Sequence, residues 1–228
     1  MPAPMLTRST QGSKDTTDGR SRRWRLHREK RRTELLKLAR NAIAECGAAA
    51  SMSEIAAHCH TSKSVFYRYF TDKDGLRQEL GNYVVARMER RMTEAVAEAG
   101  SFEESIRALV RQYFWQIQNS PEVYLFVVSE STSSEDSPVD RFCQAVTELV
   151  ANTHKNHSPG EQRIPESIAR YWAAGVVGLV RGAGEAWMLP RAASRAHHTQ
   201  LTERPGLEEF VQLVTLWVLN GPQPSQNL

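Results

Sequence analysis

The sequence predicts an all-α protein. In the segments with a regular apolar pattern, apolar residues recur every three or four positions, which is the spacing of an amphipathic helix. We find no segment with the alternation of apolar and polar residues that a half-buried strand needs. Capping residues and glycines divide the chain into helices of ordinary length. We therefore expect a small N-terminal domain of three helices and a larger C-terminal helical domain.

The chain begins with a segment that we expect to be a disordered basic arm, residues 1–27. Residues 1–22 are rich in Ser, Thr, Gly and Pro. The first helix is expected from about Glu29 to Cys46, where Gly47 ends it. Between residues 20 and 32 the single acid, Glu29, is surrounded by eight basic residues: Arg20, Arg22, Arg23, Arg25, Arg28, Lys30, Arg31 and Arg32.

Residues 51–76 contain two short helix patterns separated by a tight polar turn. Ser51 and Glu54 have the spacing of a capping box at the start of the first. Ser62 can cap the second, in which Phe66 and Phe70 are four residues apart and point inward. A helix pair of this size fits the major groove of DNA. The outer face of the second helix offers Lys63, Ser64, Val65, Tyr67 and Arg68.

This segment resembles the DNA-binding domain of the TetR family of transcriptional regulators. The matching positions are residues 51–56, residues 62–70, Lys73 and Leu76. Together with the preceding helix, the resemblance covers roughly residues 30–76. Where the family usually has Ala-Gly-Val at the turn, this chain has Cys-His-Thr, and His60 tolerates positive φ better than most residues. The resemblance implies phosphate contacts from Tyr67, Tyr69 and Lys73. The residues expected at the DNA are Ser51, Ser53, Ser62, Lys63, Ser64, Val65, Tyr67, Arg68, Tyr69 and Lys73.

The charge distribution agrees with DNA contact at the N-terminal end. The net charge is only +3, but residues 1–92 hold 19 Lys and Arg against 10 Asp and Glu, whereas residues 93–228 hold 10 against 16. A basic first domain suits a protein that docks one end on phosphate. The basic run of residues 20–32 leaves two interpretations open: a solvated helix start, or an arm that follows the DNA backbone or enters the minor groove.

The rest of the chain is also predicted to be helical. The fourth helix is expected from about Lys73 to Ala99, and Gly100 stops it. We expect a three-helix domain at 28–75, an effector-binding and dimerisation domain at 76–220, and a disordered tail at 221–228. The further helices are expected at Phe102–Gln118, Glu122–Glu130, Val139–His154, Glu166–Met188 and Leu207–Leu219.

The resemblance implies that the C-terminal domain binds a small molecule and forms a homodimer. Glycines cost about 1 kcal/mol each inside a helix, so those of residues 174–184 indicate close approach of a twin helix or of a helix in the same subunit. Arg181 and Glu185 can pair along that helix. Aromatic residues that either line a pocket or form plain core are Phe102, Tyr113, Phe114, Tyr124, Phe126, Phe142 and Trp172. The dimer candidates are Ala174, Gly178, Gly182, Phe210, Val214 and Trp217.

The sequence therefore predicts a ligand-responsive regulator, a repressor released from a palindromic operator by a small apolar, aromatic or acyl effector. The alternative is a constitutive, dimeric architectural DNA-binding protein. A defined cavity on the order of a few hundred Å³ would favour the first. We find no phosphate loop, Gly-x-Ser-x-Gly motif or zinc-spaced His pair, so no enzyme, cofactor or metal is expected. Without a long apolar run or a secretory signal, a cytoplasmic protein with no membrane partner is expected.

Overall fold

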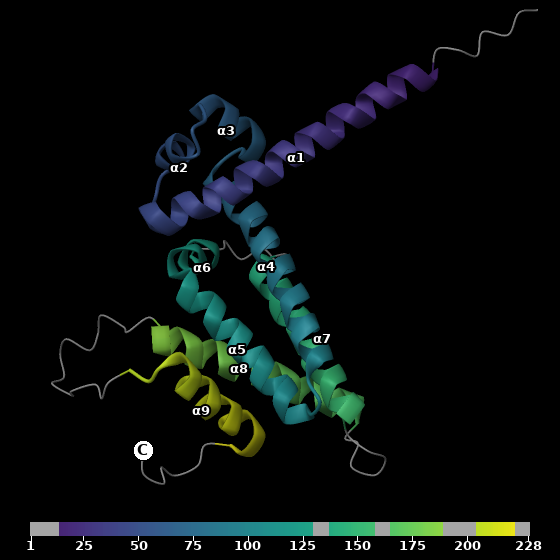
Figure 1. The fold of residues 1–228 in the computed structure, drawn as a ribbon, viewed down its shortest axis with the longest axis vertical. Coiled ribbons are helices and arrows are strands. Elements are labelled where there is room, and N and C mark those ends of the chain that lie inside the picture. The colour runs from purple at the N-terminus through teal and green to yellow at the C-terminus, as the bar shows by residue number, and fades with distance from the viewer. Residues whose placement is uncertain (1–13, 130–136, 158–164, 189–203, 222–228) are drawn as a thin grey trace, which may run out of the picture.

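The computed structural model describes residues 14–129, 137–157, 165–188 and 204–221. Their regular structure is helical, so the predicted all-α class is confirmed. Figure 1 shows α1, α2 and α3 at one end of the molecule, and α4 running from that end into a bundle with α5, α7, α8 and α9. In chain order the helices are α1 (Lys14–Cys46), α2 (Met52–His58), α3 (Lys63–Phe70), α4 (Lys73–Glu98), α5 (Phe102–Asn119), α6 (Pro121–Val128), α7 (Pro138–His157), α8 (Glu166–Met188) and α9 (Leu207–Asn220). None of these helices combines the length and the apolar character that a membrane crossing needs.

Side-chain caps fix the starts of α2, α3 and α4. The Ser51 hydroxyl accepts from the Glu54 amide at 3.3 Å, and the Glu54 carboxylate accepts from the Ser51 amide at 2.8 Å, so the predicted capping box is present. Ser62 and Asp72 each accept from the amide three residues on, at 3.3 and 2.7 Å. Between α2 and α3, His60 has a φ of 51°, the conformation that the turn was expected to need. Because each cap is worth about 0.5–2 kcal/mol, the helix pair is well defined locally.

The turn from α3 into α4 requires a glycine. Thr71 has a φ of 61°, which is rare for a β-branched residue. The Phe70 carbonyl then lies so close to Gly75 that a Cβ atom at this position would collide with the carbonyl oxygen. Close backbone packing therefore explains why a glycine stands at position 75.

Two hydrophobic cores share α4 and α6. The head core joins α1, α2 and α3 to Leu76 and Leu80 of α4 and to Val123 and Phe126 of α6. The bundle core joins the lower part of α4, including Met88, to α5, α7, α8 and α9. Side chains beyond residue 75, where the sequence suggested a domain boundary, are thus needed to complete the head core. A shift of α4 or α6 must therefore affect the packing of both cores.

Helix α1 begins earlier than the sequence suggested. It starts at Lys14, so residues 14–27, which were expected to be disordered, are helical and continuous with the predicted first helix. The stretch from Lys14 to Cys46 contains no proline and is rich in Arg, Lys, Leu, Glu and Ala, which are good helix formers. The expected disorder of residues 1–13 and of the tail after Gly221 falls outside the described residues.

Candidate functional site

Helix α3 presents a polar, basic face to solvent. Phe66 and Phe70 are fully buried on its inner side, with ring centroids 4.8 Å apart, and anchor it in the head core. Cations and hydroxyl groups on an exposed helix can bind phosphate oxygens and base edges. The exposed side chains of the outer face are Lys63, Ser64, Tyr67 and Arg68, and Val65 and Tyr69 are half-buried beside them.

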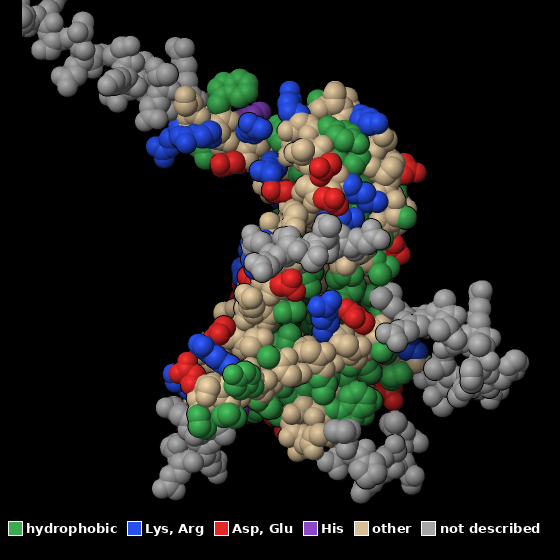
Figure 2. All heavy atoms as spheres, turned by 180° about the vertical axis from the view of Figure 1, so that it is seen from behind, with side chains coloured by type: hydrophobic (Ala, Val, Ile, Leu, Met, Phe, Trp, Pro, Cys, Tyr) green, Lys and Arg blue, Asp and Glu red, His purple; other side chains and the backbone are tan. Residues whose placement is uncertain are grey.

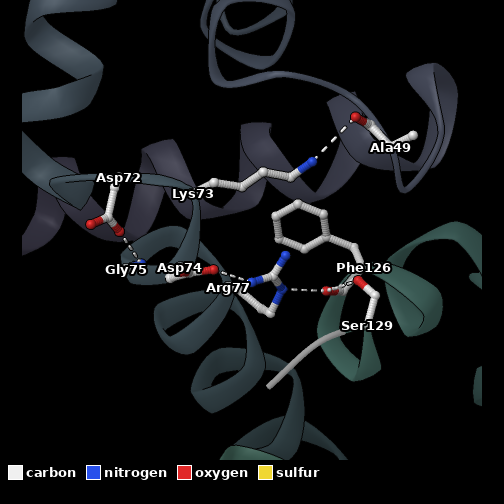
Figure 3. A network of polar contacts seen from close by, with 8 residues as sticks. All are labelled: Ala49, Asp72, Lys73, Asp74, Gly75, Arg77, Phe126 and Ser129. Carbon is white, nitrogen blue, oxygen red and sulfur yellow. Dashed lines mark hydrogen bonds and ion pairs between the residues drawn. The ribbon is translucent and has the colours of Figure 1, made fainter. Parts of the chain in front are cut away.

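The other residues expected at the DNA lie around this face. Ser53 is exposed on α2. Ser51 and Ser62 use their hydroxyl oxygens as cap acceptors, which leaves the hydroxyl proton of each able to donate elsewhere. Lys73 donates to the Ala49 carbonyl at 3.2 Å, so it ties the start of α4 to the turn between α1 and α2 (Figure 3). An ammonium group has three protons, so two remain for other acceptors.

Phe126 of α6 is held by two cations of α4. The Lys73 ammonium lies 5.6 Å and the Arg77 guanidinium 5.4 Å from the centre of its ring, within the range of cation–π attraction. Arg77 also donates from Nε to the Phe126 carbonyl at 3.0 Å and contacts the Asp74 carboxylate (Figure 3). Phe126 itself is fully buried in the head core. Lys73 and Arg77 thus join α6 to the first turn of α4, directly after α3.

The beginning of α6 is fastened to α1. The Glu122 carboxylate accepts from the Ala48 amide at 2.7 Å, and Arg40 of α1 donates to the Ser120 hydroxyl at 3.2 Å. Neither Glu122 nor Arg77 was singled out from the sequence, because each reaches a partner that is distant in the chain. The only local signal is that Arg77 follows Lys73 by four residues on the same helical face.

An apolar cavity of about 90 Å³ lies in the bundle between α4, α5, α6, α7 and α8. Its lining is mainly aliphatic, and valine is the commonest residue. α6 is one wall of this cavity and also part of the head core. The aliphatic lining is formed by Val84, Val85, Met88, Met92, Ile106, Leu109, Val110, Val123, Val127, Val128, Val139, Val146, Val150, Val176, Val177 and Val180, and Gln116, Cys143 and Arg181 add polar groups.

Three of the seven aromatic residues considered from the sequence line the cavity: Tyr113, Tyr124 and Phe142. The other four lie outside its lining and pack elsewhere. Phe126 belongs to the head core, and Phe114 is fully buried. Phe102 and Trp172 lie against each other, with ring centroids 5.9 Å apart. Helical spacing alone indicates that such residues are buried, but it cannot distinguish a cavity wall from solid core.

A polar network lies in the cavity wall. Tyr124 donates to the Glu185 carboxylate at 2.6 Å, Arg181 donates to the same oxygen at 3.0 Å, and the Tyr113 and Tyr124 hydroxyls are 3.3 Å apart. Burial, aided by the bond to Glu185, raises the pKa of Tyr124 to about 12. Burial disfavours the charged forms of Arg181 and Glu185. The ion pair between them and the hydrogen bond from Tyr124 to Glu185 outweigh this effect, so the pKa of Arg181 is raised and that of Glu185 is lowered. The pair is therefore charged at neutral pH.

Helix α8 leaves one face of small residues uncovered. Ala174, Gly178 and Gly182 are exposed, and a Cβ atom built on either glycine meets no described atom within 4 Å. Gly184 differs, because its Cβ atom would lie 2.9 Å from Phe114 of α5. Of these three positions, only Gly184 needs a glycine because of described side chains packed against it within the subunit. Large apolar side chains exposed on α8 and α9 are Ile168, Tyr171, Leu179 and Leu216.

The α9 residues considered for the dimer lie mostly inside the subunit. Phe210 and Val214 are buried in the bundle core. The Phe210 ring stacks on Phe114 and Trp187, with centroids 4.9 and 5.1 Å apart. Only Trp217 is partly accessible.

These features define a class of protein: a helix-turn-helix transcription regulator whose DNA-binding head is joined to a helical domain. The chain belongs to the TetR family. The family model for bacterial regulatory proteins of the tetR family matches residues 35–80. An uncharacterised HTH-type transcriptional regulator found in two strains of Mycobacterium tuberculosis is 32% identical over 180 residues, which cover 78% of this chain and 76% of that protein.

Solved structures share the fold at low sequence identity. FadR from Bacillus subtilis, in complex with stearoyl-CoA, aligns with a TM-score of 0.61 and 14% identity, covering 84% of this chain and 99% of that chain. LfrR from Mycobacterium smegmatis, in complex with proflavine, aligns with a TM-score of 0.57 and 17% identity, covering 87% and 99%. The ligands of these two proteins are chemically different.

Proposed function

We propose that this chain is a homodimeric, cytoplasmic repressor that leaves a palindromic operator when an acyl effector occupies its cavity. The single observation that carries the proposal is that α6 belongs both to the cavity wall and to the head core. It lines the cavity through Val123, Tyr124, Val127 and Val128, and it completes the head core through Val123 and Phe126. A ligand that displaces α6 changes the packing beneath the DNA-binding helices.

The proposed DNA contacts use the exposed face of α3. Lys63 and Arg68 are the groups for base edges or phosphate, and Ser64 and Val65 contact bases. Tyr67, Tyr69 and Lys73 hold phosphates, together with Ser51, Ser53 and Ser62 at the ends of α2 and α3. These contacts give affinity that falls with salt and fix the register of α3 in the groove.

The proposed dimer interface is the uncovered face of α8. The absence of described atoms near Gly178 and Gly182 leaves room for the backbone of a twin helix. Exposed Tyr171 and Leu179 lie on the same helix and Leu216 on α9, so two copies can bury a continuous apolar surface. Phe210 and Val214 then support α9 from inside the subunit, and Trp217 lies at the edge of the interface.

The lining favours an aliphatic chain over a flat aromatic molecule. Burial of alkyl groups against valine, leucine and methionine gains about 0.8 kcal/mol per methylene. The Arg181 guanidinium bonds Glu185 through Nε and has further N–H groups for a carbonyl or anionic group attached to that chain. The acyl-CoA bound by FadR combines these two features, whereas the proflavine bound by LfrR has no alkyl chain.

The cavity is too small for such an effector in this state. At about 90 Å³ it is smaller than the few hundred Å³ that would by itself favour a ligand sensor over a constitutive binder, and it lies below the roughly 300–1,000 Å³ of ligand sites, so the proposal requires its walls to move apart on binding. A ligand that binds only the expanded state weakens DNA binding by linkage, typically by about 5–150-fold. The route proposed for this coupling is from α6 through Phe126 to Lys73 and Arg77.

A titration of operator DNA tests the proposal. The operator is first selected from random duplex by the full-length protein, and a palindromic consensus is expected. Stearoyl-CoA should then lower the affinity about 5–150-fold, and proflavine at the same concentration should not. Release by proflavine alone would exclude the acyl effector. Dimeric, sequence-selective binding that neither compound changes would favour the constitutive architectural protein, and no selected sequence would refute DNA-binding regulation.

A further inference from the structure

We propose that the projecting part of α1, from Arg22 to Lys30, is a second DNA-binding surface that holds the phosphate backbone beside the segment read by α3. The inference rests on the proposed operator binding, but it concerns a surface outside the helix-turn-helix. It adds contacts that depend on charge and position and not on base sequence.

The projecting part of α1 has no packing role within the subunit. Residues 21–30 are all exposed, and the first fully buried residue of the helix is Leu35. Trp24 and Leu26 are 76% and 57% exposed, although residues of these types usually lie inside. A helix without a buried face receives no stabilisation from tertiary contacts, so its order depends on the helix propensity of its residues and on continuity with the packed part of α1, and its side chains are left for a binding partner.

Four cations of this part are available to an outside partner. Within the described residues, Arg22, Arg25, Arg28 and Lys30 have no carboxylate in ion-pair range, and the first three follow at intervals of three along one side of the helix. The next two arginines differ, since Arg31 pairs with Glu34 and Arg32 with Glu79. The described ion pairs of α1 thus begin where the helix meets the head, and Arg22, Arg25, Arg28 and Lys30 lie before that point with exposed side chains.

The projecting part lies at the end of the molecule that reads DNA. Figure 1 shows α1 extending from the head, the end of the molecule that carries α2 and α3, and pointing away from the bundle of α5, α8 and α9. Figure 2 shows Lys and Arg side chains gathered on this projection and on the neighbouring head. From Arg22 to Lys30 the helix is about 12 Å long at 1.5 Å per residue. That length corresponds to about three to four base pairs at 3.4 Å each, so the projection can lie along the backbone next to the half-site.

Duplex DNA fits this surface better than a membrane does. Trp24 and Leu26 are two residues apart and so point to different sides of the helix, which leaves it without the apolar stripe of a membrane-surface helix. Exposed cations that outnumber the single acid of this segment, Glu29, match the regular negative charge of the DNA backbone. The partner is therefore assigned as the phosphate backbone that flanks the operator half-site.

The test compares the full-length protein with the triple variant Arg22→Gln, Arg25→Gln, Arg28→Gln. Two duplexes of the selected operator serve as probes: one trimmed at the outer edges of the half-sites, and one extended by mixed sequence on both sides. The wild type should bind the extended duplex more tightly and with a steeper salt dependence. The variant should lose this advantage, with the slope of log K against log salt falling by about 0.9 for each phosphate contact removed. Its preferred sequence should be unchanged.

A variant with the same change of net charge controls for long-range attraction. Arg87, Arg90 and Arg107 lie on the bundle helices α4 and α5, and their replacement by Gln should leave the difference between the two duplexes intact. Equal loss in both variants, or a wild type that binds both duplexes equally, would overturn the inference. Stronger binding of the projection to anionic phospholipid vesicles than to the extended duplex would also overturn it. If no operator is selected, the proposed function itself fails, which is a separate result.

Discussion

Replacement of Arg77 by Met is predicted to uncouple the effector cavity from DNA binding. The Arg77 side chain is only 14% exposed, its Nε donates to the Phe126 carbonyl at 3.0 Å, and its guanidinium lies 5.4 Å from the Phe126 ring. Methionine keeps a long apolar stem in the same space but has neither the charge nor the donors. The variant therefore removes the Arg77 contacts between α4 and α6, leaves the Lys73 contact with the Phe126 ring, and preserves most of the packing.

The size of the effect follows from the contacts that are lost. A hydrogen bond from a charged donor contributes about 1.5–3 kcal/mol, and a cation–π contact about 0.5–2 kcal/mol. Because surrounding groups relax, we expect a loss of about 2–3 kcal/mol in the free energy of unfolding, or about 4–12 °C in Tm for a chain of this length. A coupling free energy of 1–3 kcal/mol is of the same size. The factor by which stearoyl-CoA weakens operator binding should therefore fall toward one.

The assay is an operator titration with and without stearoyl-CoA, performed on the wild type, Arg77→Met and Arg90→Met. Arg90 lies on the same helix, is 67% exposed and pairs with Glu94 at 4.0 Å, so its replacement should change stability by less than about 1 kcal/mol and leave release intact. A correctly folded Arg77→Met protein that stearoyl-CoA releases as strongly as the wild type would refute the proposed route through Phe126.

Further predictions concern the dimer, a turn, the cavity and pH. Gly178→Leu should leave the subunit folded but shift sedimentation toward monomer, because its neighbourhood within the subunit is open; a fully dimeric variant would move the interface elsewhere. Gly75→Ala should lower the free energy of unfolding by about 1–3 kcal/mol in urea titrations, because its Cβ meets the Phe70 carbonyl, and an unchanged midpoint would contradict this. Val150→Phe fills the cavity and should reduce release by stearoyl-CoA while operator affinity of the free protein stays within about twofold; undiminished release would place the effector elsewhere. Because folding lowers the pKa of Glu185, its carboxylate stabilises the fold above the ordinary carboxyl pKa, and this contribution is lost as the pH falls through the pKa of the folded state. Glu185→Gln should therefore reduce the fall of Tm at acidic pH. An identical dependence of Tm on acidic pH in the wild type and the variant would exclude Glu185 as its source.

The parts of the fold that depend on local chemistry could be predicted from the sequence. The capping box of Ser51 and Glu54, the caps at Ser62 and Asp72, and the positive φ of His60 all involve residues within a few positions of one another. Such interactions depend on residue type and spacing alone, so the order of the helices and the position of the helix pair followed from them.

The parts that depend on distant contacts could not be predicted in this way. Phe126 was considered for the pocket because it is aromatic and lies in an apolar helix, yet it completes the head core 50 residues or so away from its partners in the chain. The extension of α1 was missed because its composition resembles that of a disordered arm, while its helix propensity is high. The aromatic candidates were left open between cavity lining and core, and three of the seven line the cavity; valines, which give no distinctive sequence signal, form most of the lining.

The free energy needed to open the cavity sets a requirement on the effector. A ligand larger than about 90 Å³ that is held entirely within the cavity must displace a wall, and α4 and α6 are the walls that also belong to the head core. An acyl chain that buries about eight methylenes gains roughly 6 kcal/mol, which exceeds the 1–3 kcal/mol of a typical allosteric coupling. A chain that buries only two gains about 1.6 kcal/mol, which such a coupling can cancel. Release should therefore grow with acyl chain length in a series of acyl-CoAs of constant head group, and a release factor that is independent of chain length would show that the head group, and not the aliphatic lining, drives the change.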